Sequence, residues 1–236
     1  MKNSLKLVLA LLAIGLTSCN GNVNIGSGNI ITEKRNITEN FDKIEASSGV
    51  NVFITQGTTE DVVVETDDNV MKYVITKVEN GTLIIKVKRN TNIMSSIDVK
   101  VQMQNIAGLK ASSGATIETQ NTIRGTSLNM KSSSGSDIQA VIEYEDVICE
   151  TSSGSTLTVS GKALQVQTNS SSGSDIDASE LIANEYISKA SSGSGSRVNP
   201  IVKLDAQASS GSTIEYVKIP KTLTKIESSG GSVEKD

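Results

Sequence analysis

Two carboxylates, Asp137 and Asp175, are the residues of this sequence whose spacing comes nearest to a catalytic pair. Each stands two positions after the glycine of a Ser-Gly-Ser stretch, and they are 38 residues apart. A glycoside hydrolase needs two carboxyl groups about 5–9.5 Å apart, one acting as acid and the other as base or nucleophile. Acidic residues on the outside of a repetitive fold are also ordinary solvated surface. Asp137 and Asp175 are therefore a candidate ligand column. A second set of acids recurs two positions further along its repeats: Glu118, Asp177, Glu215 and Glu234.

The residue types that usually accompany such acids are missing. The sequence has no histidine and no tryptophan, so it lacks the commonest general base, the commonest metal ligand and the best side chain for stacking on sugars. No segment matches a calcium-binding loop. Cys149 occupies an alternating apolar position, which predicts a buried, unreactive thiol. We expect a protein that is not an enzyme, with no catalytic residue, no metal and no cofactor.

The other cysteine, Cys19, ends a segment typical of bacterial lipoprotein export. Lys2 and Lys6 precede an apolar run, Leu7–Leu16, that is about half of the roughly 20 residues a spanning helix needs. The run closes with Leu-Thr-Ser-Cys, small residues before a thiol that can carry a diacylglycerol. We expect residues 1–18 to be a lipoprotein signal peptide and Cys19 to be the lipidation site.

Charge and cysteine content narrow the possible partners. Lys2 and Lys6 leave with the signal peptide, so the formal net charge falls from −4 to −6. A mildly acidic chain without a basic cluster predicts no nucleic-acid partner. Because an acylated Cys19 cannot pair with Cys149, no disulfide within the chain is expected.

The main pattern that would position these residues is a repeat. Ser-Ser-Gly recurs with glycines at 49, 114, 135, 154, 173, 193, 211 and 230, and from Gly114 onward the steps are 21, 19, 19, 20, 18 and 19 residues. A period this regular indicates one structural unit per repeat. About 19 residues is too short for a helical pair or a propeller blade, and it fits one coil of a β-helix.

Positions relative to each glycine alternate between apolar and polar residues, as in strands. We expect glycine at each corner with a positive φ, and small serines hydrogen-bonded within the bend. The copy at Gly193 looks two residues longer and recovers its apolar position at Val198. Three residues after the glycine stand Ile117, Ile138, Leu157, Ile176, Ile214 and Val233. Five residues before it stand Met130, Cys149, Thr168, Ser188 and Ala206.

The fold class predicted is therefore all-β, a parallel β-helix (solenoid) with coils of about 19 residues and an irregular β N-terminal cap. Residues 19–36, rich in Asn and Gly, are expected to be a tether. Residues 37–235 are expected to form a single β-helix domain, with 37–105 as the irregular capping part and 106–235 as regular Ser-Ser-Gly coils. The turn signal Asn80-Gly81 joins two of the expected strands in the cap.

At this point the chain resembles the GIN domain, a head domain of adhesin-like proteins found in the Bacteroidota and other bacteria. The resemblance covers roughly residues 37–235 and implies a right-handed β-helix shaped like pectin-lyase-type folds, without a shared catalytic set. The motifs that carry it are Phe41, Ile44, the run Ser48-Gly49-Val50-Asn51-Val52, Gln56-Gly57, Leu83-Ile84-Ile85 and the serial Ser-Gly-Ser copies at 135, 154, 173 and 193.

The function expected is that of a non-catalytic cell-envelope lipoprotein that presents a β-helical surface for binding or adhesion to protein or glycan. Two alternatives stay open: a polysaccharide-processing enzyme that uses the acidic column, and a purely structural envelope protein. The protein is expected to be exported and anchored by lipid, in the outer membrane. Surface-displayed lipoproteins often carry acids soon after the cysteine, and here the first is Glu33. The membrane face, and the oligomeric state, are left open.

Overall fold

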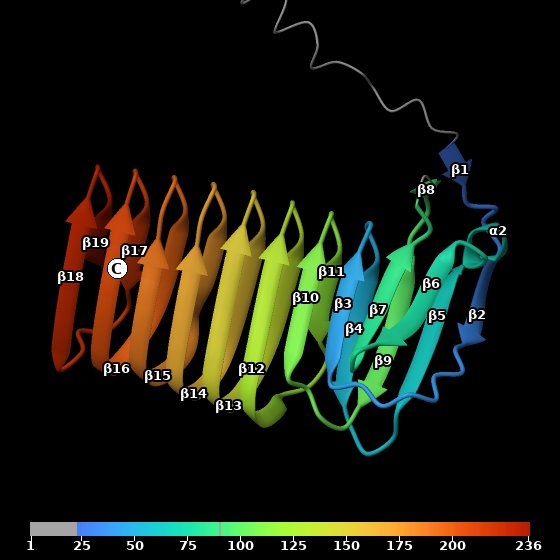
Figure 1. Ribbon diagram of the computed structural model, residues 1–236, viewed down its shortest axis with the longest axis horizontal. Helices are drawn as coiled ribbons and strands as arrows, with labels where there is room; N and C mark the ends of the chain where they lie inside the picture. Colours follow the sequence, from blue (N-terminus) through green and yellow to red (C-terminus); the bar gives the residue numbers. More distant parts are fainter. Residues whose placement is uncertain (1–22, 90) are drawn as a thin grey trace, which may run out of the picture.

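The structure, a computed structural model, describes residues 23–89 and 91–236. Nearly all of its regular structure is β (Figure 1). In that part of the chain no helix is long and apolar enough to cross a membrane. The coils contain β10 (Gly108–Ser112), β11 (Thr116–Thr119), β12 (Ile123–Ser133), β13 (Asp137–Ser152), β14 (Thr156–Ser170), β15 (Asp175–Ala190), β16 (Gly195–Ser209), β17 (Thr213–Tyr216), β18 (Thr222–Ser228) and β19 (Ser232–Lys235). The cap contains β2 (Ile30–Lys34), β3 (Lys43–Ser47), β4 (Asn51–Gln56), β5 (Asp61–Asp67), α2 (Asp68–Met71), β6 (Val74–Glu79), β7 (Thr82–Val87) and β9 (Asp98–Met103), and a separate ribbon pairs β1 (Val23–Ile25) with β8 (Asn92–Met94).

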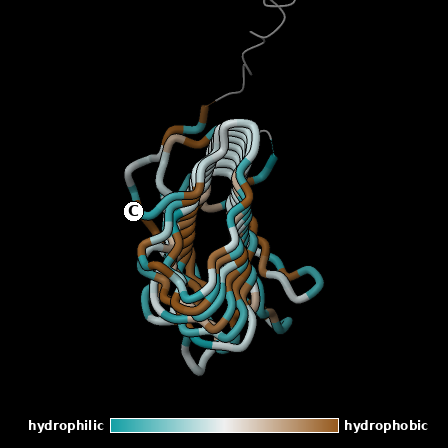
Figure 2. The backbone as a smooth tube through the Cα atoms, turned by 90° about the vertical axis from the view of Figure 1, so that its left-hand side faces the viewer, coloured by the Kyte–Doolittle hydropathy of each residue, from teal (hydrophilic) through white to brown (hydrophobic). Residues whose placement is uncertain are grey.

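The repeat region is the solenoid that the period predicts. Each coil pairs in parallel with the next, and the partners of one position are 17 to 21 residues apart, as in Thr116 with Asp137, Asp137 with Thr156, and Gly195 with Thr213. A strand such as β13 runs from one Ser-Gly turn to the next and covers both faces of its coil. The coils therefore form two sheet faces that share one turn edge (Figure 2).

Stacking places like residues in columns, and the inward columns form the core. The residues three after each glycine are directly paired and buried, which confirms this column from Ile117 to Val233. The predicted inward column from Met130 to Ala206 is buried as well. Figure 2 shows apolar segments lining the interior, with the Ser-Gly turns stacked at one edge.

The expected two-residue insertion after Gly193 is wrong. Ser196, three residues after that glycine, pairs with Ile176 and Ile214 and lies buried in the aliphatic column. Val198 pairs with Ala178 instead. The substitution is tolerated because the Ser196 hydroxyl is 3.0 Å from the hydroxyl of Ser170 in the preceding coil, so this buried polar group is hydrogen-bonded.

The turns stack through two left-handed residues. Each repeat glycine has a positive φ, as predicted, and so does the serine before it, with φ between 49° and 69°. This pair has the backbone of a type I′ turn. The buried serine is the one after the glycine: the Ser155 hydroxyl accepts a hydrogen bond from the Ser152 N–H at 3.2 Å and contacts the carbonyl of Ser132, one coil away, at 2.8 Å.

In the cap, spatial order departs from sequence order. β3 pairs with β10 on one side and with β7 on the other, and β4 likewise lies between β11 and β9. The later strands β7 and β9 therefore form the coil outside the first one. The antiparallel strands β6, β5 and β2 cover this end. Since β2 pairs with β5, the sheet already includes Ile30–Lys34, within the segment expected to be a tether.

The opposite end is closed by charged side chains. In the last coil the inward columns continue with Lys225, which pairs with Ala206, and Glu227, which pairs with Ala208. Lys225 donates to the carbonyl of Val233 at 2.6 Å, and Glu227 accepts from its N–H at 2.6 Å. Inward charges of this kind make an open strand edge a poor template for another chain.

Candidate functional site

Asp137 and Asp175 lie in one outward column, as predicted. Thr156 separates them, so they are two coils apart. Two inter-strand steps put their backbones about 9.6 Å apart, at the upper limit for a glycosidase pair. The Asp137 carboxylate accepts a hydrogen bond from the Gln139 amide at 2.8 Å.

The second acidic column contains a residue that the sequence analysis missed. Arg197 stands between Asp177 and Glu215 in the same column. Its guanidinium pairs with Glu215 at 3.0 Å and with Asp236, and the hydrogen bond with Asp236 raises the pKa of Arg197. Asp177 in turn accepts from the Ser179 N–H and hydroxyl. Asp177 and Glu215 are therefore partnered within the protein.

Cys149 is fully buried in the inward column, and burial raises the pKa of its thiol to about 12. The thiolate is the nucleophilic form, and the predicted burial of this thiol is confirmed. Cys19 lies outside the described residues. Among the residues that are described, no three acidic or cysteine side chains gather as a metal site would require.

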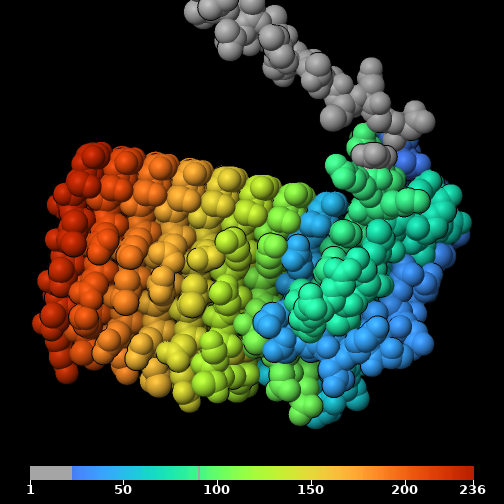
Figure 3. Space-filling view, in the orientation of Figure 1, coloured from blue at the N-terminus to red at the C-terminus, as the bar shows by residue number. Residues whose placement is uncertain are grey.

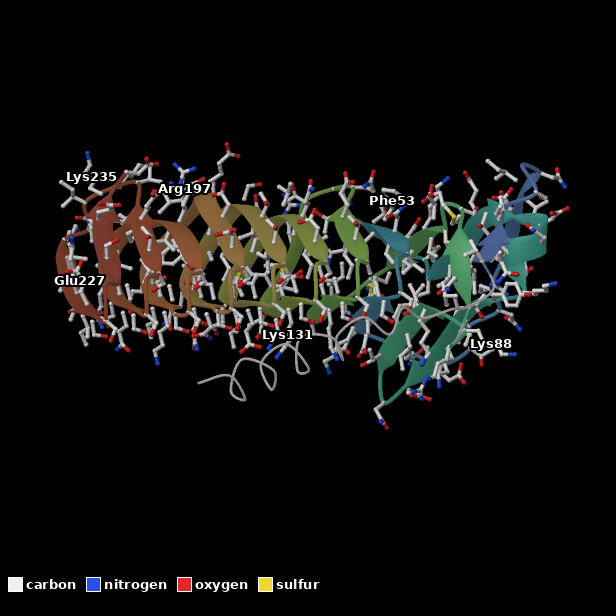
Figure 4. The ribbon with its side chains drawn as sticks, turned by 90° about the horizontal axis from the view of Figure 1, so that it is seen from above. Phe53, Lys88, Lys131, Arg197, Glu227 and Lys235 are labelled. Atoms are coloured by element: carbon white, nitrogen blue, oxygen red, sulfur yellow. The ribbon has the colours of Figure 1, made fainter. Side chains whose placement is uncertain are left out.

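A hollow lies on the opposite face from Arg197, beside the turn edge (Figure 4). We call it the axial groove, because it runs across six successive coils, a length of about 24 Å, with a volume of about 560 Å³. Its face is the one seen in Figure 3. One wall is a column of mostly long polar residues: Lys131, Glu150, Asn169, Lys189, Gln207 and Ile226. The other wall is a column of serines, half-buried at Ser152, Ser171, Ser191 and Ser209 and exposed at Ser228.

The two halves of the axial groove differ in how far their polar groups are satisfied. At one end Lys131 and Glu150 form an ion pair at 3.1 Å. Further along, the side chains of Asn169, Lys189 and Gln207 take part in none of the hydrogen bonds or ion pairs formed among the described residues. The hydroxyls of the serine wall are equally unengaged. Hydrogen-bond donors and acceptors thus repeat from coil to coil along this half of the groove, without partners among the described residues.

The sequence contains signals for both Arg197 and the groove walls. Counting four residues from Gly193, without an insertion, gives Arg197 in register with Asp177 and Glu215. The groove walls are the fourth and second residues before each glycine. Their spacing is readable, but the hollow between them depends on how neighbouring coils stack.

Comparisons with known proteins agree with this architecture. Residues 40–220 match the family described as "putative auto-transporter adhesin, head GIN domain". A putative adhesin from Bacteroides fragilis superposes with a TM-score of 0.85 at 16% identity, covering 90% of this chain and 100% of that one. A putative lipid binding protein from Parabacteroides distasonis gives 0.75 at 17% identity, covering 91% and 100%. A putative adhesin from Parabacteroides merdae gives 0.72 at 16% identity, covering 91% and 99%. No curated protein matches the sequence. With the family model spanning most of the chain, the protein belongs to the GIN domain family.

Proposed function

We propose that the protein is a non-catalytic binding module of the cell envelope, anchored by lipid at Cys19, and that the axial groove holds an extended glycan. Solved relatives described as adhesins, and one described as a lipid binding protein, support a binding role in general. The signal-like segment and the cysteine at its end support the anchor. Of the acids that an enzyme would use, Asp137 accepts a hydrogen bond from Gln139, and Glu215 is ion-paired with Arg197.

The observation that carries the ligand class is the free polar lining of the axial groove. Ser171, Ser191 and Ser209 present hydroxyls on one wall, and Asn169, Lys189 and Gln207 present amide and ammonium groups on the other. Successive copies are about 4.8 Å apart, comparable to the length of one sugar unit in an extended chain. Protein sites read polar ligands through such convergent donors and acceptors, and the ammonium of Lys189 would favour a sugar carrying a carboxylate.

A glycan array followed by calorimetry tests the ligand class. The test variant is Asn169→Ala with Lys189→Ala. The matched control is Gln139→Ala with Thr158→Ala, which removes two exposed polar side chains from adjacent coils on the opposite face. Each lost hydrogen bond to the ligand is worth about 0.5–1.5 kcal/mol, so the groove variant should bind about tenfold more weakly or worse, with the control unchanged. Equal affinity for both variants would reject the groove as the site.

The anchor and the enzyme alternative have separate tests. Radiolabelled fatty acid should label the wild type and leave a Cys19→Ala variant unlabelled, and label on both would reject Cys19. Turnover of a polysaccharide that is lost in Asp137→Asn or Asp175→Asn would overturn the non-catalytic assignment. Protease added to intact cells distinguishes a surface-exposed groove from one that faces the periplasm.

A further inference from the structure

The ribbon formed by β1 and β8 leaves an unusual apolar surface at the cap end. Val23 is 51% exposed, Ile25 is 70% exposed and Met94 is 69% exposed. In the ribbon Val23 pairs with Asn92, and Ile25 pairs with Met94. Paired residues of neighbouring strands point to the same side, so these three apolar side chains share one face. The intervening Ile93 points the other way and packs against the core.

This ribbon is fixed to the domain rather than hanging from it. The loop after β1 is tied to the segment around α2 by several hydrogen bonds. Gly28 donates its N–H to Asp67 at 2.6 Å, Ser27 donates its hydroxyl to Asp68 at 2.6 Å, and Asn69 donates to the carbonyl of Ile25 at 2.8 Å. The exposed face therefore has a defined direction relative to the solenoid. Figure 1 places the ribbon of β1 and β8 at the corner where the cap end meets the turn edge.

The chain length before β1 says what could cover this face. Only residues 20–22 separate Cys19 from Val23. A fully extended chain of four steps reaches about 14 Å, so a lipid on Cys19 brings the bilayer surface within that distance of Val23. Such a short connection cannot let the domain turn away freely from the membrane.

Basic side chains lie at the same end. Lys72 follows α2, and Lys88 and Arg89 stand in the connection from β7 to β8. The backbone N–H of Lys88 donates to the carbonyl of Tyr73 at 2.8 Å, which places it beside Lys72. None of the three enters an ion pair with another described residue. Lysine and arginine near a membrane surface are attracted to anionic headgroups.

We infer that the Val23, Ile25 and Met94 face rests on the bilayer beside the lipid anchor and fixes the direction in which the solenoid leaves the membrane. This inference rests on the proposed anchor at Cys19. The bilayer interface accommodates apolar side chains flanked by basic ones. The far coils, with most of the axial groove, then extend away from the anchored corner.

An environment-sensitive fluorophore tests whether this face contacts the bilayer. The full-length, processed protein is reconstituted in vesicles of phosphatidylethanolamine and phosphatidylglycerol, with the dye on a Met94→Cys variant. Cys149 is buried, so the introduced thiol is the one that reacts. The matched control is Ile219→Cys, because Ile219 is 70% exposed and equally apolar, but lies at the opposite end of the solenoid.

The dye at position 94 should emit at shorter wavelength in vesicles than in detergent-free buffer, and lipid-borne quenchers should quench it. The dye at position 219 should do neither. If the protein floats with the vesicles but both dyes emit as they do in water, the membrane contact of this face is overturned and the anchor stands. If the wild-type protein does not float with the vesicles, both the anchor and the membrane contact of this face are rejected. The same holds if the Cys19→Ser variant floats as well as the wild type does.

Discussion

Replacing Ser155 with alanine removes the hydroxyl that ties one Ser-Gly turn to its neighbours. That hydroxyl accepts from the Ser152 N–H at 3.2 Å, and lies 2.9 Å from the Ser152 carbonyl and 2.8 Å from the Ser132 carbonyl of the adjacent coil. Ser155 is buried. Alanine fits the space but leaves the Ser152 N–H without this partner, in a bend closed by stacked backbone.

The expected cost follows from that burial. A buried donor left without a partner costs about 1–3 kcal/mol, and Ser155→Ala should lower the free energy of unfolding by that amount. Ser153 is the matched control, because it is exposed, stands two residues away in the same turn and has φ of 57°. Ser153→Ala removes an exposed hydroxyl that makes no hydrogen bond with another described residue, so it should stay within about 0.5 kcal/mol of the wild type.

Urea unfolding followed by circular dichroism measures both variants. Solenoids can unfold in segments, so the comparison is valid where the dependence on urea is the same for all three proteins. A clear loss in Ser155→Ala with none in Ser153→Ala is the expected outcome. Equal effects would refute the reasoning, since they would mean that the buried serine column contributes no more than surface serines.

Three further outcomes are expected. Ile176→Asp buries a charge in the aliphatic column and should cost about 4 kcal/mol or more, whereas Ile176→Val should cost about 0.5–1.5 kcal/mol; similar unfolding midpoints for the two would contradict the column. Because burial raises the pKa of Cys149 from 9.0 to about 12, the unfolded chain releases this proton first, so its contribution to stability is complete below about pH 9 and is lost as pH rises toward 12. The difference in urea midpoint between the wild type and Cys149→Ala should therefore change above pH 9, to the disadvantage of the wild type, and a constant difference would be inconsistent with the buried thiol. Lys225→Leu with Glu227→Ala removes the inward charges of the last coil, and light scattering should detect concentration-dependent association through the open edge of β18; a variant as monodisperse as the wild type would contradict that role.

Much of the solenoid follows from local sequence. The glycine spacing predicts the coil length, and the positions of Ile138 and Cys149 relative to their glycines predict that both are buried. These predictions succeed because each coil meets nearly the same surroundings as the next, so one pattern is repeated and reinforced. The positive φ at glycine was predictable for the same reason. The matching φ at the preceding serine was not, because serine is not a residue that this backbone conformation favours.

Tertiary structure decided the features that depend on which strands meet. The cap places β7 and β9 outside β3 and β4, although they come later in the chain, because aliphatic strands such as Leu83-Ile84-Ile85 can pair in several orders and local sequence does not choose among them. At the Gly193 copy the stacking register has no insertion, so Arg197 lies between Asp177 and Glu215 and pairs with Glu215. The axial groove exists because small serines stack beside longer polar residues over six coils. The sequence by itself determined the repeat, its columns and its buried residues, while packing between distant segments determined the shape and charge of the surfaces that a ligand or membrane would meet.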